Sequence, residues 1–208
     1  MDYIEIEKEM KKTYDAIAVK YEEEAKDDWK NKDIIDKFLR YLNNNSSILD
    51  IACGTGELLK YYDNKGFKTT GIDISESMIK ITKNKVPNAK IINKSLYNID
   101  EIDEKFDGIS ATFIFVHIPK EKINEVISKI NNRLIKNGIF FTVFTTSQKE
   151  GLQKEPLDNN YNYYVVNYSN KEICEILKNN GFEILENKQI KRINKLDIGF
   201  VIGRKKYE

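Results

Sequence analysis

The sequence has few of the residues that build disulfide frameworks and metal centres. Its 208 residues include two cysteines, one histidine and three prolines. Cys53 and Cys174 are too few for a disulfide framework or a cysteine-based zinc site. His117 alone cannot supply a histidine-rich metal centre. We therefore expect no protein-bound metal and a core that is stable without such staples.

Charge of one sign and long apolar runs are also missing. The 34 basic and 33 acidic residues leave a formal net charge of +1, so no bulk charge attracts nucleic acid. No apolar stretch approaches the roughly 20 residues of a membrane-spanning helix, and residues 1–12 lack the apolar segment of a signal peptide. These absences predict a cytoplasmic globular protein that binds neither nucleic acid nor membrane. The length predicts one domain over residues 1–208.

The first 45 residues follow a helical period. Within residues 4–25, apolar side chains recur at steps of three and four and would share one helix face. These side chains are Ile6, Met10, Tyr14, Ile17 and Tyr21. A second apolar helical stretch covers residues 34–42, and the polar cluster at residues 43–46 ends it.

From residue 47 onward, the pattern alternates between strand and helix. Apolar runs predict strands at residues 47–52, 68–73, 89–93, 106–112, 138–145, 182–190 and 196–202. A helix is predicted at residues 57–62, and another begins after an N-cap at Ser75. A third is predicted from Pro119 in its first turn to Gly138, which would end it with a positive φ. A fourth begins at a capping box at Ser169 and ends at Gly181. This alternation is typical of a doubly wound, Rossmann-like α/β fold. We expect a mostly parallel seven-stranded sheet with helices on both faces and an antiparallel last strand.

Residues 146–168 interrupt the alternation. The segment begins polar and then carries several tyrosines, among them Tyr161 and Tyr163. Their two-residue spacing fits a strand with one face towards a pocket, and it also fits a plain strand. We interpret the segment as an insertion on the substrate side, with Tyr161 and Tyr163 as candidate substrate contacts.

The turn after the first predicted strand carries the most informative motif. Residues 48–59 read Ile-Leu-Asp-Ile-Ala-Cys-Gly-Thr-Gly-Glu-Leu-Leu, a buried strand that leads through two glycines into a helix. Ligands of doubly wound sheets bind at this edge, where Gly54 and Gly56 let ligand atoms approach the backbone and helix N–H groups face the ligand. A dinucleotide fingerprint requires a third glycine, and Leu59 occupies that place. This disfavours a nucleotide-dependent oxidoreductase.

An acidic residue ends the next predicted strand. Asp73 stands 17 residues (73 − 56) after Gly56, and a carboxylate there can accept hydrogen bonds from both hydroxyls of a ribose. Because no pyrophosphate signature accompanies it, the pair of motifs favours an adenosine ligand that carries no phosphates.

Residues 49–56 and 71–78 together resemble the class I S-adenosylmethionine-dependent methyltransferases, and the small-molecule branch fits best. The likeness continues through residues 105–119, 134–140 and 168–182, and residues 14–21 resemble the lid helix of that branch. It implies an N-terminal helical lid over residues 1–45, S-adenosylmethionine as cofactor, and methyl transfer to N or O of a small-molecule metabolite. A non-catalytic protein that binds S-adenosylmethionine or S-adenosylhomocysteine is the alternative. The quaternary structure stays open between monomer and homodimer.

The resemblance implies roles for matching positions. Asp50 would contact the methionine amino end, Asp73 the ribose, and Ile74 and Met78 the adenine. The turn backbone would pass beneath the cofactor, with Ala52 where glycine is common; the turn positions are Ala52, Cys53, Gly54 and Gly56. Ser95 stands where the family often has an acidic residue that reads the adenine amino group, and Leu96 would cover the adenine.

His117 follows the fourth predicted strand, where the loop would face the transferred methyl. It is either a general base or a packed residue before Pro119. Tyr14 and Tyr21 either pack the core or form an aromatic lid near the sulfonium, and Trp29 either joins that lid or anchors the chain. The acceptor would enter between the N-terminal helix, residues 113–117 and residues 146–168. Phe113 is the candidate substrate contact in that loop.

Overall fold

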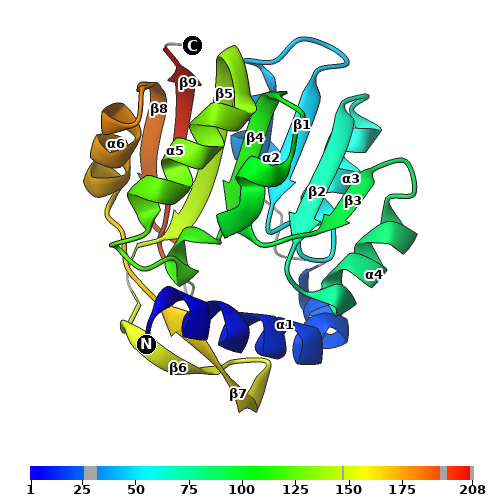
Figure 1. The fold of residues 1–208 in the computed structure, drawn as a ribbon, viewed down its shortest axis with the longest axis vertical. Helices are drawn as coiled ribbons and strands as arrows, with labels where there is room; N and C mark the ends of the chain where they lie inside the picture. Colours follow the sequence, from blue (N-terminus) through cyan, green and yellow to red (C-terminus); the bar gives the residue numbers. More distant parts are fainter. Residues whose placement is uncertain (26–31, 147, 193–195, 207–208) are drawn as a thin grey trace.

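The computed structural model describes residues 1–25, 32–146, 148–192 and 196–206. Within them, seven strands form one sheet in the order β3-β2-β1-β4-β5-β9-β8 (Figure 1). Strands β1 to β5 pair in parallel, whereas β9 runs antiparallel to both of its neighbours, β5 and β8. These strands are β1 (Ser47–Ile51), β2 (Lys68–Asp73), β3 (Lys90–Asn93), β4 (Phe106–Thr112), β5 (Leu134–Thr145), β8 (Phe182–Ile190) and β9 (Ile198–Lys205). The predicted fold class is confirmed.

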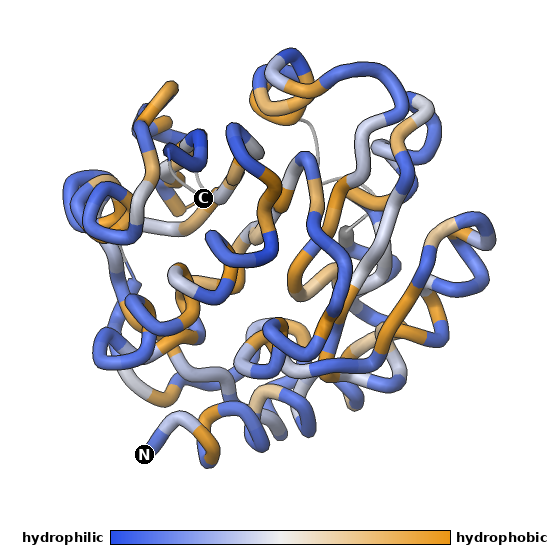
Figure 2. The backbone as a smooth tube through the Cα atoms, turned by 45° about the horizontal axis from the view of Figure 1, so that its top comes forward, coloured by the Kyte–Doolittle hydropathy of each residue, from blue (hydrophilic) through white to orange (hydrophobic). Residues whose placement is uncertain are grey.

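Helices cover both faces of the sheet because its central strands are apolar on both sides. Along β5, Phe140 and Phe144 join one buried cluster, whereas Phe141 and Val143 join the other, as the two-residue period of a strand requires. Helices α5 (Ile123–Arg133) and α6 (Asn170–Asn179) pack on the first cluster, and α2 (Lys32–Leu39) and α3 (Glu57–Asn64) on the second. Figure 2 shows hydrophilic and hydrophobic residues alternating along the helices.

Two helix starts agree with their sequence signals. The Ser75 hydroxyl accepts a hydrogen bond from the Met78 N–H at the start of α4 (Glu76–Lys85). Ser169 and Glu172 form the complete capping box of α6. Both caps satisfy N–H groups that have no partner within the helix.

Two predictions around α5 are wrong. Pro119 lies in the turn before the helix, which begins at Ile123. The helix ends at Arg133, and β5 already begins at Leu134, because the buried Leu134 pairs with Phe106 of β4. Asn137, not Gly138, has the positive φ, at 61°. A Cβ on Gly138 would lie 2.9 Å from the Ile135 carbonyl oxygen, so this glycine is required for close approach.

A long helix and a hairpin lie across the carboxyl edge of the sheet. Helix α1 (Tyr3–Ala25) runs beneath the strand ends, and the hairpin of β6 (Gly151–Glu155) and β7 (Asp158–Val165) lies against it (Figure 1). Two short 3-10 helices, η1 (Leu96–Glu101) and η2 (Phe115–His117), follow β3 and β4. None of the helices within the described ranges is long and apolar enough to cross a membrane.

Candidate functional site

The two-glycine turn between β1 and α3 is shaped by left-handed backbone. Gly54 and Gly56 have φ of 52° and 83°, and Ala52 has φ of 56°. A Cβ on Gly56 would lie 2.7 Å from Thr82 Cγ2, so this position requires glycine for space as well as conformation. Ala52 carries a Cβ in the left-handed region, which costs about 1–2 kcal/mol. Strain of this kind is often found where a loop is shaped for a ligand.

Asp73 ties this turn to the end of β2. Its two carboxylate oxygens accept hydrogen bonds from the Gly54 N–H at 2.9 Å and the Ser75 N–H at 2.8 Å. Burial raises the pKa of Asp73, and these two N–H donors oppose part of that shift. A carboxylate has about four acceptor sites, so Asp73 keeps capacity for further donors.

Asp50 lies deeper, within the sheet. It is 2% exposed and accepts a hydrogen bond from the Ser110 hydroxyl at 2.6 Å. Burial raises the pKa of Asp50 to about 7; the Ser110 bond opposes this shift and the nearby Asp73 adds to it. The Thr55 hydroxyl oxygen, in the turn beside Asp50, is buried and has no hydrogen-bond partner within the part of the chain that the structure describes. The site thus holds a carboxylate and a hydroxyl that an additional polar ligand group would satisfy.

A cavity of about 100 Å³ opens at this turn, and we call it the turn cavity. Most of the predicted site residues line it: Tyr14, Tyr21, Ala52, Gly54, Asp73, Ile74, Met78, Leu96, Phe113 and His117. Asp50 and Cys53 line a small adjoining cavity that shares Gly54 and Phe113 with it. Gly56 instead stands at the N-cap of α3. Helix α1 contributes Met10, Tyr14 and Tyr21 to the lining of the turn cavity.

Ser95 lies outside the lining of the turn cavity. Its hydroxyl accepts a hydrogen bond from the Tyr97 N–H and donates one to the Glu7 carboxylate of α1. The Cys53 thiol is buried against Gly71 and Leu59, and burial raises its pKa well above the usual value. The Cys53 side chain is therefore an unreactive part of the core.

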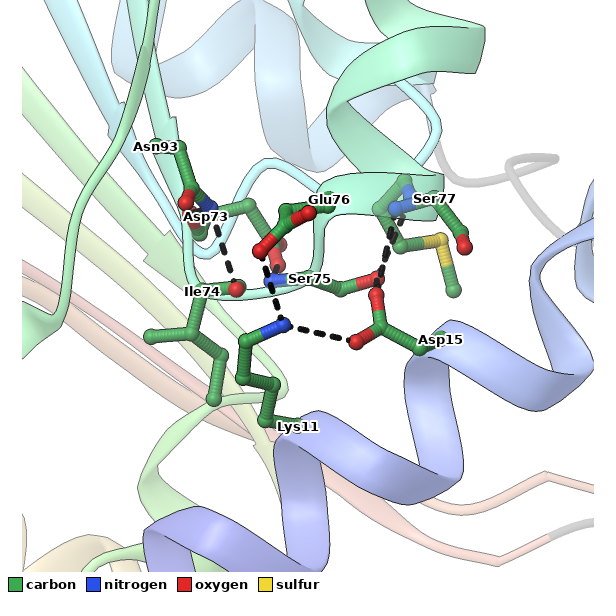
Figure 3. A network of polar contacts seen from close by, with 9 residues as sticks. Lys11, Asp15, Asp73, Ile74, Ser75, Glu76, Ser77 and Asn93 are labelled. Atoms are coloured by element: carbon green, nitrogen blue, oxygen red, sulfur yellow. Dashed lines mark hydrogen bonds and ion pairs between the residues drawn. The ribbon is translucent and has the colours of Figure 1, made fainter.

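Polar contacts hold α1 against the start of α4 (Figure 3). Asp15 accepts hydrogen bonds from the Ser75 hydroxyl at 2.7 Å and the Ser77 N–H at 3.1 Å. Lys11 bridges Asp15 and Glu76 at 2.8 and 3.3 Å. On its other side α1 contacts β7, where the Thr13 hydroxyl donates to the Asn162 carbonyl oxygen at 2.6 Å. Helix α1 is thus fixed both to the turn that presents Asp73 and to the hairpin.

A larger cavity of about 480 Å³ lies on the hairpin side, and we call it the hairpin cavity. Its lining comes from α1, α2, β5, the β6–β7 hairpin, residues 113–117, Gln148, and Arg192, Leu196 and Ile198 around the start of β9. Both cavities are lined by the same four side chains, Tyr14, Tyr21, Phe113 and His117, which we call the dividing wall. Phe113 has a φ of 58°, so a strained backbone presents one member of the wall.

His117 is held by two hydrogen bonds that fix its tautomer. Nδ1 lies 2.6 Å from the Tyr164 carbonyl oxygen, and Nε2 lies 2.9 Å from the Tyr14 hydroxyl. A carbonyl oxygen only accepts, so Nδ1 carries the proton and Nε2 accepts from Tyr14. Burial lowers the pKa of His117 to about 4, and the Tyr164 bond opposes this only in part. His117 is therefore neutral at physiological pH.

The two tyrosines predicted to contact substrate are placed differently. Tyr163 lines the hairpin cavity and meets the His117 ring edge to face at 6.2 Å between centroids. Tyr161, two residues earlier on β7, is half-buried and is not part of either cavity lining. Trp29 lies outside the described residues.

Sequence reasoning missed several residues of the site. Glu155 is 7% exposed and lines the hairpin cavity, and Thr55 carries the unpartnered hydroxyl. Thr55 belongs to the same glycine motif as Asp50, so the motif itself could have indicated that Thr55 is a site residue. Glu155 has no local signal, because it is one glutamate among the 33 acidic residues of the chain.

Comparisons with known proteins agree with this geometry. A family model described as a methyltransferase domain matches residues 21–187. An uncharacterized methyltransferase of Alkaliphilus oremlandii is 29% identical over 158 residues, 70% of this chain and 71% of that protein. A ubiquinone/menaquinone biosynthesis C-methyltransferase of Campylobacter jejuni is 26% identical over 130 residues, 59% of this chain and 54% of that enzyme. The chain thus spans about half the length of the Campylobacter enzyme.

Solved structures share the fold at low identity. A DhpI–SAH complex superposes with a TM-score of 0.81 and 16% identity, covering 98% of both chains. An S-adenosylmethionine-dependent methyltransferase of Clostridium acetobutylicum gives a TM-score of 0.72 and 17% identity, covering 94% of this chain and all of that one (100%). The family model covers most of the chain, including the glycine turn, Asp73 and His117. The chain therefore belongs to the methyltransferase domain family.

Proposed function

We propose that this enzyme transfers a methyl group from S-adenosylmethionine to a nitrogen or oxygen atom of a small molecule. The observation that carries the proposal is the dividing wall, whose four side chains line both the turn cavity and the hairpin cavity. A donor on one side and an acceptor on the other would meet at this wall. The hairpin cavity has a volume typical of small-molecule sites.

The residues around the turn cavity fit S-adenosylmethionine. Asp73 retains acceptor capacity for ribose hydroxyls, and Ile74, Met78 and Leu96 offer apolar surface for adenine. Asp50 is a buried carboxylate with no ion pair among the residues that the structure describes, which suits the ammonium of the methionine end. The unpartnered Thr55 hydroxyl lies in the same small cavity.

When bound, S-adenosylmethionine supplies a methyl group on a sulfonium sulfur that is already activated for in-line displacement. The work of the chain is then to position the acceptor and exclude water. Helix α1 is the lid that closes the site, and the β6–β7 hairpin is the substrate-side insertion. Met10, Tyr14 and Tyr21 of α1 line the turn cavity, so the position of α1 sets the space available to the cofactor.

Tyr14 and His117 provide a route for the acceptor's proton. Tyr14 lies in the dividing wall and donates its hydroxyl proton to Nε2 of the neutral His117. An acceptor hydroxyl or amine can pass its proton to the Tyr14 oxygen while Tyr14 passes its own to Nε2. Tyr14 thus faces the acceptor, and His117 is the base behind it.

Calorimetric titration with S-adenosylmethionine, S-adenosylhomocysteine and NAD tests the proposal. We expect micromolar affinity for the two sulfur nucleosides and none for NAD, because the turn lacks the third glycine. A metabolite panel is then scored by mass spectrometry for gain of a methyl group. Binding without any turnover would favour the non-catalytic alternative, and no binding of either sulfur nucleoside would contradict the proposal.

Cofactor binding is expected to release a proton near pH 7. The pKa of Asp50 in the free protein is raised to about 7, so about half of these carboxyls are protonated there. A bound ammonium favours the carboxylate, lowers that pKa and expels the proton. The calorimetric enthalpy should therefore depend on the ionisation enthalpy of the buffer. This dependence on the buffer should disappear in Asp50→Asn. If it persists in that variant, Asp50 is not the group that releases the proton.

A further inference from the structure

The hairpin cavity contains a buried carboxylate with no cationic partner within the part of the chain that the structure describes. Glu155 ends β6, is 7% exposed and lines this cavity. One of its oxygens, Oε1, accepts a hydrogen bond from the Leu157 N–H at 3.1 Å. No ion pair is found for Glu155 among the described residues, and a buried carboxylate without a charge partner is costly.

The hairpin turn alone does not explain this burial. Asp158, three residues later, makes the same kind of local bond to the Asn160 N–H at 3.2 Å. The Asp158 carboxylate also pairs with Lys20 at 2.7 Å at the surface. A carboxylate can therefore accept the backbone hydrogen bond of a turn while it stays at the surface and pairs with a lysine. Glu155 instead places its carboxylate inside a cavity.

Aromatic rings surround the same space. Tyr14, Tyr21 and Tyr163 line the hairpin cavity with Glu155. Burial raises the pKa of Tyr14 and of Tyr163, and the negative charge of Glu155 raises both pKa values further. A carboxylate among aromatic rings is a favourable environment for an organic cation.

Two other charged side chains face this cavity among the described residues. Glu24 of α1 is exposed. Arg192 is half-buried, and its Nε donates a hydrogen bond to the Leu196 carbonyl oxygen at 2.6 Å. Burial raises the pKa of Glu155, with the Leu157 N–H opposing the shift. Of the three charged side chains described in the lining of this cavity, Glu155 is thus the most buried.

We infer that the methyl acceptor carries an ammonium group and that Glu155 binds it. The inference rests on the proposed function and narrows its substrate class to small cationic amines. A charge-assisted hydrogen bond to the ammonium would replace the missing charge partner of Glu155, and the tyrosine rings would stabilise the same cation. Glu155 is then a specificity-determining residue for the acceptor.

Three probes of similar size and different charge test the inference. Phenethylamine, 3-phenylpropan-1-ol and 3-phenylpropionate are titrated at neutral pH into protein saturated with S-adenosylhomocysteine. We expect the amine to bind about tenfold or more tighter than the alcohol and the carboxylate. The Glu155→Gln variant should lose this preference and keep its affinity for S-adenosylhomocysteine. Gln retains an oxygen that can accept from the Leu157 N–H. Glu121→Gln, at an exposed position outside both cavity linings, is the matched control that should keep the preference.

The outcomes separate the inference from the proposed function. If S-adenosylhomocysteine does not bind, the proposed function fails and the inference fails with it. If it binds and wild-type protein shows no preference for the amine, including no amine binding at all, the inference is overturned while the proposed function stands. If 3-phenylpropionate binds most tightly, the inference is also overturned, because this result would indicate that Arg192 binds an anionic acceptor. The wild-type comparison needs no variant, and retained preference in Glu155→Gln would exclude Glu155 as the anchor.

Discussion

Replacing Asp73 with alanine should weaken S-adenosylmethionine binding by about 100-fold or more. The variant removes the carboxylate expected to accept two ribose hydroxyls, and hydrogen bonds to charged groups contribute about 1.5–3 kcal/mol each. It also releases the Gly54 and Ser75 N–H groups that Asp73 holds in the structure, so the turn loses its shape. Calorimetric titration gives the dissociation constant directly.

Two variants make this result specific. Asp103→Ala removes an exposed carboxylate and matches the change in net charge, so its affinity should stay close to wild type. Asp73→Asn keeps one oxygen acceptor but loses the charge, and its affinity should lie between wild type and Asp73→Ala. Thermal unfolding of each variant shows whether the fold survives. An unchanged dissociation constant in a folded Asp73→Ala protein would exclude the ribose assignment.

Replacing Tyr14 with phenylalanine or His117 with alanine should slow methylation of a hydroxyl acceptor by about 100-fold or more. Each variant interrupts the proton route at one end, because the Tyr14 hydroxyl and His117 Nε2 are joined by one hydrogen bond. Since the two act as a unit, the double variant should be little slower than either single one. Single-turnover rates at saturating cofactor isolate the chemical step, and S-adenosylhomocysteine affinity should change much less.

The pH profile adds an independent test of the same route. Burial holds the pKa of His117 at about 4, below the usual histidine value of about 6.5. Nε2 is therefore available as a base above about pH 4 and is lost only as the pH falls through that value. The wild-type rate should show no inflection near pH 6.5. Tyr161→Phe, outside both cavity linings, is the control. A His117→Ala rate equal to wild type from about pH 6 to 9 would contradict the base role.

Local sequence was sufficient to predict the positions of the glycine turn and of Asp73 in the fold. The strand, the glycine turn and the start of α3 follow one another within residues 47–57, and Asp73 ends the adjacent strand. Parallel pairing of β1 with β2 then brings the glycine turn and Asp73 to the same edge of the sheet. The rest of the sheet topology adds little to this placement. The caps at Ser75 and Ser169 were equally local, because each hydroxyl bonds a backbone N–H three residues ahead.

Long-range pairing overruled local signals in other places. Lys136-Asn137-Gly138 has the composition of a helix stop, yet it lies inside β5 because Leu134 is buried against β4. Ser95 stands at the adenine-reading position of the sequence motif, but its hydroxyl contacts Glu7, 88 residues earlier in the chain. Burial and partners of this kind depend on elements distant in the sequence, which no local pattern encodes.

The sequence by itself determined the fold class and the sheet edge at which we propose that the nucleoside binds, since both depend on short periodic segments and on one turn. Only the tertiary structure decided what the acceptor side contains. It brings Tyr14 to His117 across 103 residues, fixes the His117 tautomer through Tyr164, and buries Glu155 in the hairpin cavity. These properties arise from packing α1 and the β6–β7 hairpin against the carboxyl edge, because burial and hydrogen-bond partners shift the pKa of a side chain away from the value that its residue type sets.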